Sequence, residues 1–82
     1  MPAVFRSGGY RFFFLSNEGN PREPSHIHVH RAGIVAKFWL WPEVKVALND
    51  GFNARELREL SDIIEQHRDE ITRTWDDFFG SG

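Results

Sequence analysis

Residues 26–40 read HIHVHRAGIVAKFWL and carry the clearest strand pattern of the chain. This stretch consists of two β-forming runs joined by Ala32-Gly33, and in a strand successive side chains point to opposite faces. The first run places its three histidines on one face and its aliphatic residues on the other. The second run, Ile34–Leu40, has apolar residues at every second position and so offers a continuous core face. The stretch therefore predicts a pair of antiparallel strands with a histidine face and an apolar face.

Further β-rich runs lie on both sides of this pair. Val4–Arg6 and Tyr10–Leu15 are separated by Ser7-Gly8-Gly9, a short glycine connection typical of a hairpin. Because Tyr10–Leu15 is apolar on both faces, we expect it to be a central strand. Trp41-Pro42 interrupts the sheet, since proline cannot donate to a ladder, and the alternation over 44–48 indicates a short last strand.

The C-terminal third of the chain predicts a helix that begins at Ala54. Asn53 is a good N-cap, and Glu56 three residues later completes a capping box. The apolar stripe of this helix comprises Leu57, Leu60, Ile64, His67, Ile71, Trp75 and Phe78. Its intervals of three or four residues are those of an amphipathic helix. We expect one helix over 53–79, or two helices with a break near His67.

These elements predict an α+β fold, in which an antiparallel, twisted sheet of four or five strands packs against a long C-terminal helix. The 82 residues suit a single domain, 1–82, with the sheet over 1–49 and a flexible tail over 80–82. Residues 16–25 form a loop of turn-forming residues within the sheet region. Loops of this length in compact domains tend to carry function.

Charge and composition narrow the classes of function. The net charge of −2 combines six Lys or Arg and three Asp or Glu in residues 1–49 with four and nine in residues 50–82. The basic front half could attract phosphate, but a pI near 6.0 is not that of a dedicated nucleic-acid binder. The sequence has no cysteine, no run long enough to span a membrane, and a first segment that reads as a strand rather than a signal peptide. We therefore expect a soluble, cytoplasmic protein without a membrane partner.

The histidine face is the first candidate site. Alternate residues of a strand lie about 6.6 Å apart, so the imidazoles of His26, His28 and His30 could converge on a metal such as zinc. Two of them, together with Glu18, Glu23 or His67, would supply the three protein ligands of a catalytic zinc site. An exposed polar strand face without a metal is the alternative.

Several separated motifs also occur in a recognisable order. They are Gly9-Tyr10-Arg11-Phe12-Phe13-Phe14, Ser16-Asn17-Glu18, Pro24 followed by His26-Ile27-His28-Val29, Ala36-Lys37-Phe38-Trp39-Leu40, Gly51-Phe52 with Glu56-Leu57, and Glu65-Gln66-His67-Arg68. The pattern resembles the short bacterial proteins grouped as domain of unknown function 4160, and the resemblance extends from Val4 to Phe79. Two positions depart from it: Ser25 replaces a second proline, and His30 is not a position that we expect the family to keep as histidine.

The resemblance implies a two-gene module of the toxin-antitoxin kind. We expect this chain to be the toxin-like member and a small antitoxin-like protein to be its partner. The candidate site residues that the resemblance carries forward are His26, His28, His67, Arg68, Glu18, Arg11 and Lys37. If the site is catalytic, it requires no cofactor: a histidine would act as general base, and an arginine or lysine would stabilise an RNA phosphate, as in small ribonucleases.

Two other classes of function stay open. One is a non-catalytic module that binds a metal or a protein through the His-x-His strand, and the other is a homodimer joined by exposed aromatic residues such as Trp39 or Trp41. His67 also has two interpretations, because a histidine on an apolar helix stripe often donates to a carbonyl group within the core. Whether the side chains of His28 and His67 face one cleft separates these interpretations.

Overall fold

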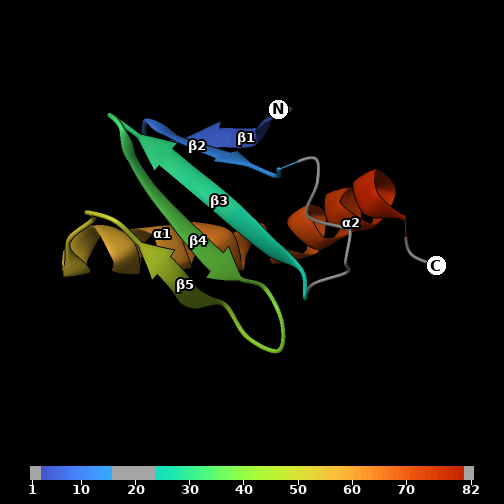
Figure 1. Ribbon diagram of the computed structural model, residues 1–82. Helices are drawn as coiled ribbons and strands as arrows, with labels where there is room; N and C mark the ends of the chain where they lie inside the picture. The colour runs from blue at the N-terminus through green and yellow to red at the C-terminus, as the bar shows by residue number, and fades with distance from the viewer. Residues whose placement is uncertain (1–2, 16–23, 81–82) are drawn as a thin grey trace.

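The computed structural model of the chain describes residues 3–15 and 24–80. Five strands and two helices follow one another in these ranges: β1 (Ala3–Ser7), β2 (Tyr10–Phe13), β3 (His26–Arg31), β4 (Ile34–Trp39), β5 (Lys45–Asn49), α1 (Ala54–Gln66) and α2 (Arg68–Phe79). All neighbouring strands pair antiparallel in sequence order, α1 lies against one face of the sheet, and α2 continues past the end of the sheet (Figure 1). The predicted α+β fold is confirmed, including the short last strand.

Two-residue turns close the β1–β2 and β3–β4 hairpins at the same end of the sheet. Gly8 and Gly9 have φ values of 60° and 82°, and Ala32 and Gly33 have values of 52° and 82°. Positive φ at both central residues is the signature of a type I′ turn, whose twist matches that of the flanking strands. The β3–β4 turn holds an uninterrupted register from the Arg31–Ile34 pair to the far end of the hairpin.

Ala32 is an exposed residue with a side chain in the left-handed region, which costs an L-residue roughly 1–2 kcal/mol. Asparagine tolerates this conformation, and Asn-Gly is a preferred type I′ sequence. We therefore expect Ala32→Asn to raise the free energy of unfolding by about 0.5–1 kcal/mol in a urea titration followed by circular dichroism. The same substitution at Ala54, an exposed helical residue, should not stabilise the protein. Equal effects at both positions would contradict the explanation.

The core lies between the helices and one face of the sheet. Its fully buried strand residues are Phe12, Ile27, Val29 and Phe38, and its fully buried helix residues are Leu60, Ile64 and Ile71. Along β3 and β4 these residues alternate with those of the opposite face, as the sequence pattern predicts. Tyr10 ties this layer to α1, because its hydroxyl donates to Glu59 Oε1 at 3.0 Å. Burial raises the pKa of Tyr10, and the hydrogen bond to the Glu59 carboxylate adds to the rise.

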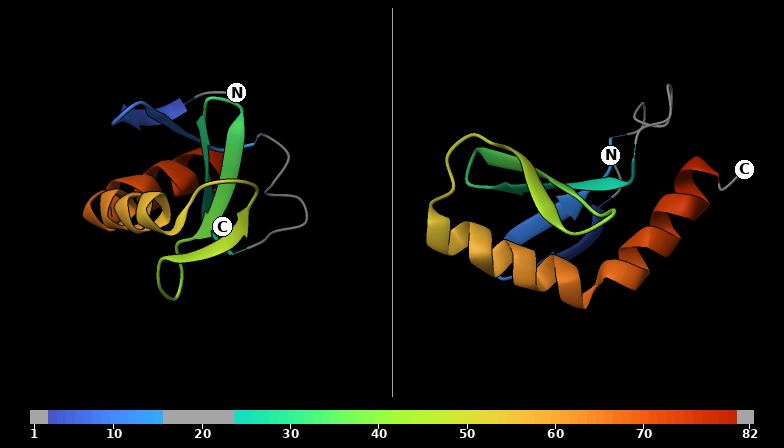
Figure 2. Two further views of the ribbon diagram at one scale, coloured as in Figure 1. Left: turned by 90° about the vertical axis from the view of Figure 1, so that its left-hand side faces the viewer. Right: turned by 90° about the horizontal axis from the view of Figure 1, so that it is seen from below.

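The helical region follows the predicted pattern in detail. Asn53 Oδ1 accepts from the Glu56 backbone N–H at 2.8 Å, and Glu56 Oε1 accepts from the Asn53 N–H at 2.9 Å, which completes the capping box. The helix breaks at His67, so that α1 and α2 form a bent arm beside the sheet (Figure 2). The break had been one of two open alternatives. The last described residue, Gly80, caps α2, and residues 81–82 of the expected tail lie outside the described ranges.

Two strands are shorter than their apolar runs. β2 ends at Phe13 rather than Leu15, and Phe14 is buried with its ring 5.2 Å from that of Trp75 in α2. β4 ends at Trp39, and the Leu40 N–H donates to the Ser25 carbonyl. Apolar residues beyond the strand ends therefore serve packing rather than pairing.

Candidate functional site

Charge is divided between the two layers of the molecule. The five strands contain five Lys or Arg residues and no Asp or Glu, whereas the two helices contain four Lys or Arg and eight Asp or Glu, a net charge of −4. Within the described residues no helix lies across the sheet face that points away from α1, and Trp75 of α2 packs against His26 at one end of it (Figure 2). We call this face the open face. The helix α1, which carries four of the acidic residues, lies on the other side of the sheet.

Cross-strand pairing defines the residues of the open face, because paired residues of an antiparallel sheet point to the same side. The pairs form three rows: Arg6–Arg11–His30–Val35, Phe13–His28–Lys37–Leu48 and His26–Trp39–Lys45. Four of the five strand cations therefore share the face with the three histidines. The fifth, Arg31, lies on the helix side with its guanidinium 4.9 Å from the Tyr10 ring.

His28 and Lys37 are direct partners at the middle of the open face. The imidazole of His28 stacks on Phe13 with ring centroids 5.5 Å apart, and the Arg11 guanidinium lies 4.6 Å from the same phenyl ring. Lys37 Nζ lies 4.6 Å from the Trp39 ring. Cations and rings thus alternate across three strands, and all except Phe13 are half-buried, so they remain accessible from solvent.

His26 has a different environment from the other two strand histidines. It is 0 % exposed, its Nδ1 donates to the Pro24 carbonyl at 2.9 Å, and its ring packs 4.9 Å from Trp75 and 5.5 Å from Trp39. Its ring also meets that of His28 edge-on at 5.4 Å. His26 therefore packs against Trp39 and His28, and its buried ring is not accessible to a ligand.

The structure does not support zinc at the three histidines. Among residues 3–15 and 24–80, no group of three or more His, Cys, Asp or Glu side chains is arranged to hold a metal ion. The contacts of the side chains explain this. The His26 ring packs against Trp39 and Trp75, and the His28 ring stacks on Phe13. Regular spacing along a strand places side chains on one face but does not make their rings converge.

A hollow of about 210 Å³ adjoins His28 and Lys37. Its lining includes His28, Val35, Ala36, Lys37, Leu48 and Asp50. Leu48, which pairs with Lys37, is 67 % exposed and forms the outer wall. The hollow is an extension of the open face towards the edge strand β5, and neither Leu48 nor Asp50 was a candidate from the sequence.

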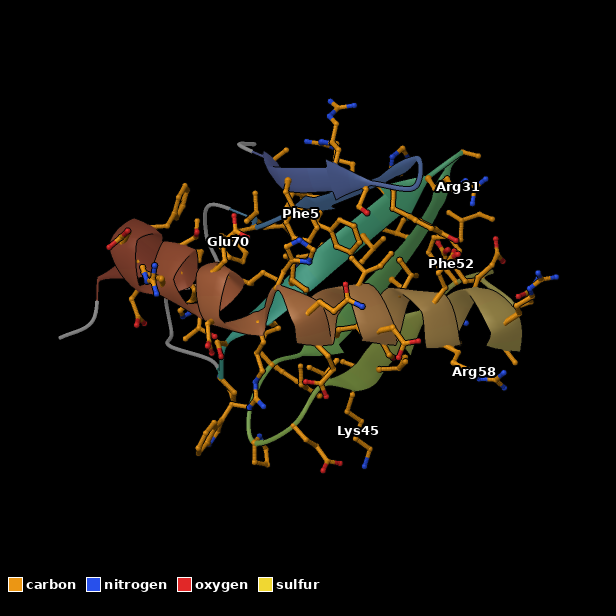
Figure 3. The ribbon with its side chains drawn as sticks, turned by 180° about the vertical axis from the view of Figure 1, so that it is seen from behind. Phe5, Arg31, Lys45, Phe52, Arg58 and Glu70 are labelled. Carbon is orange, nitrogen blue, oxygen red and sulfur yellow. The ribbon has the colours of Figure 1, made fainter. Side chains whose placement is uncertain are left out.

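His67 lies on the helix side of the sheet. The His67 ring stacks on Phe5 at 4.5 Å, and Phe5 in turn stacks on the core residue Phe12 (Figure 3). His67 Nδ1 donates to the Ile63 carbonyl at 2.9 Å, as expected for a histidine on an apolar stripe. Because His28 stacks on Phe13, whose side chain points opposite to that of Phe12, the sheet separates the two histidines.

Arg68 borders a second, larger hollow of about 520 Å³ next to α2. Its guanidinium donates to the Pro42 carbonyl at 2.8 Å and lies 5.9 Å from the ring of Trp41. Trp41 is 68 % exposed, whereas Trp39 is half-buried beside Lys37. Of the two tryptophans considered for a dimer interface, Trp41 is thus the more exposed one.

The candidate residues therefore divide into groups. The open face brings together Arg11, His26, His28 and Lys37, whereas His67 and Arg68 lie elsewhere, and Glu18 and Glu23 are outside the described residues. Sequence reasoning did not assign Phe13 to the site. The strand register could have found it, since Phe13 pairs with His28.

Fold and site together define a small α+β protein in which one face of the sheet carries basic, histidine and aromatic side chains. A family model described as Domain of unknown function (DUF4160) matches residues 9–76, and the chain belongs to this family. The resemblance noted from the sequence motifs is thereby confirmed. No curated protein and no solved structure matches the chain. Neither described helix is both long enough and apolar enough to cross a membrane.

Proposed function

We propose that this chain acts on single-stranded RNA through the open face, as the toxin-like member of a two-protein module in the cytoplasm. The observation that carries the proposal is the direct pair of His28 and Lys37, flanked by Arg11 and Trp39 on a sheet whose strands contain no acidic residue. The antitoxin-like partner is part of the same proposal. The partner is proposed from the family resemblance, and the geometry of the open face does not contribute to this part.

The pattern of the open face suits both parts of an RNA strand. Lysine and arginine neutralise phosphates, and flat side chains on a sheet offer surfaces on which unpaired bases stack. Burial of Phe13 and His26 holds the rings of His28 and Trp39 in place before a ligand arrives. A preordered surface loses less conformational entropy on binding.

The same residues can support cleavage of the strand. The His28 imidazole would accept the proton of a ribose 2′-hydroxyl, whose oxygen then attacks the neighbouring phosphorus. The bond from this phosphorus to the 5′-oxygen of the next nucleotide breaks, a 2′,3′-cyclic phosphate forms, and the departing 5′-oxygen takes up a proton from water. The positive charges of Lys37 and Arg11 would stabilise the additional negative charge that develops on the phosphate oxygens. This chemistry needs the 2′-hydroxyl and therefore distinguishes RNA from DNA.

Replacement of His28 tests the proposal. Because base stacking contributes about 1–3 kcal/mol per base, we expect His28→Ala to weaken binding of a fluorescein-labelled single-stranded RNA about tenfold in an anisotropy titration. Arg58→Ala is the matched control: Arg58 is exposed on α1 and projects away from the sheet (Figure 3), so its loss should change the affinity less than twofold. No RNA binding by the unaltered protein, or an equal loss in both variants, would refute the proposal.

A growth-arrest assay tests the toxin-like role. Expression of the unaltered chain in a bacterial host should arrest growth, and His28→Ala and Lys37→Ala should relieve the arrest at equal protein levels. His28→Ala is a cleaner variant than His26→Ala or His67→Ala, because both of those side chains also support the core. Unchanged toxicity of the His28 and Lys37 variants would exclude the open face as the source of the arrest.

A further inference from the structure

We propose that the hollow beside His28 binds one guanine base of the RNA strand and that the Asp50 carboxylate recognises its Watson–Crick edge. This inference rests on the proposed function and adds a base preference to it. The hollow shares two residues, His28 and Lys37, with the centre of the open face. A strand that binds the open face therefore passes directly over the mouth of the hollow.

The size and lining of the hollow suit a single base. Its volume of about 210 Å³ lies below the roughly 300–1,000 Å³ of pockets for drug-sized ligands, so it can take one ring system rather than a whole nucleotide. Val35 and Leu48, whose side chains point to the open face, give it apolar walls. Pockets that hold an unstacked base combine apolar or aromatic walls with a few polar groups that read the base edge.

Asp50 is held in a defined orientation at the edge of the hollow. Its Oδ1 accepts from the Val35 backbone N–H at 2.9 Å, and its own N–H donates to the Val35 carbonyl at 3.1 Å. Within residues 3–15 and 24–80, Oδ2 takes part in no hydrogen bond. One oxygen thus fixes the carboxylate to β4 and the other is available to a ligand.

The neighbouring polar side chain cannot perform this recognition. The Asn49 amide donates to the Phe52 carbonyl at 2.9 Å, and its Oδ1 accepts from the N–H groups of Gly51 and Phe52. Asn49 therefore holds the turn that follows β5. Among the described lining residues, Asp50 is the one that carries a carboxylate.

The chemistry of a carboxylate selects guanine. An ionised carboxylate only accepts hydrogen bonds, and the guanine edge offers two adjacent donors, N1–H and the 2-amino group. The corresponding edges of adenine, cytosine and uracil each offer one donor group next to an acceptor, which would face the carboxylate. A good two-bond contact to a base discriminates by about tenfold or more against the wrong base.

Four RNA heptamers test the inference: heptauridylate and its variants with adenine, cytosine or guanine at the central position. Fluorescence anisotropy with the unaltered protein should show the guanine heptamer to bind about tenfold more tightly than the other three. Inosine at the central position removes only the 2-amino group and should lose most of this preference. Asp50→Asn, which keeps an oxygen for the Val35 N–H, should reduce the preference to less than twofold.

Asp62→Asn on α1 is the matched control, because it makes the same change in an exposed residue on the helix side. It should leave the guanine preference intact. Equal binding of all four heptamers would overturn the inference and leave the proposed function standing. A guanine preference that persists in Asp50→Asn would overturn the role of Asp50. Failure of the unaltered protein to bind any heptamer would overturn the proposed function together with the inference.

Discussion

Replacement of both Arg11 and Lys37 by glutamate is expected to lower the affinity for single-stranded RNA by about a hundredfold. The double variant changes four units of charge on the open face, where both cations lie beside the rings that we propose to bind bases. Two unit charges 4 Å apart in water interact by about 1 kcal/mol. Four such units correspond to roughly 4 kcal/mol, or about a thousandfold, which screening by salt reduces towards a hundredfold.

The salt dependence of binding provides a second measurement on the same variant. The slope of log K against log salt concentration is about −0.7 per neutralised phosphate for single strands, so the loss of two contacts should make it shallower by about 1.4. The matched control is Arg55→Glu with Arg58→Glu, an identical change of charge on exposed residues of α1. If this control weakens binding as strongly as the open-face variant, binding depends on net charge alone and the open face is not the site.

Phe12→Ala is expected to have the largest effect on stability. Phe12 is 0 % exposed on the helix side of β2, its ring stacks on Phe5 at 4.4 Å, and through Phe5 it supports His67 at the junction of α1 and α2. Truncation of a buried phenylalanine costs about 3–5 kcal/mol. For an 82-residue chain this is a large part of a total stability of about 5–15 kcal/mol.

Urea denaturation followed by circular dichroism measures this effect. The control is Leu48→Ala, which removes a large apolar side chain that is 67 % exposed and should change the free energy of unfolding by less than about 0.5 kcal/mol. A Phe12→Ala variant within 1 kcal/mol of the unaltered protein would show that the helix–sheet layer is not the main source of stability.

Much of the fold could be predicted because its signals are local. The Asn53–Glu56 capping box and the alternation over 26–40 each depend on residues a few positions apart, and both predictions are confirmed. The break at His67 could only be offered as an alternative. At this break the His67 ring stacks on Phe5, a residue near the other end of the chain, and the pattern of the helical segment contains no sign of such a contact.

The candidate site was less predictable than the fold. Alternation correctly assigned His26, His28 and His30 to one face but could not show that a tryptophan from α2 closes over the first of them. Alternation also gave no sign of Asp50, which follows β5 and is held by two hydrogen bonds to Val35 in the neighbouring strand β4. The three histidines of the sequence favoured a metal site. The contacts in the structure instead show aromatic rings packed beside lysine and arginine side chains.

By itself, the sequence determined the strands, the helix start, the family and the face on which the three histidines lie, since strand periodicity and capping act over a few neighbouring residues. The tertiary structure was needed to show which histidines are accessible from solvent. His26 is buried against Trp75, His28 is held between Phe13 and Lys37, and His67 is on the far side of the sheet. Burial and ring contacts arise between residues distant in the chain, and the pattern of any single segment does not contain them.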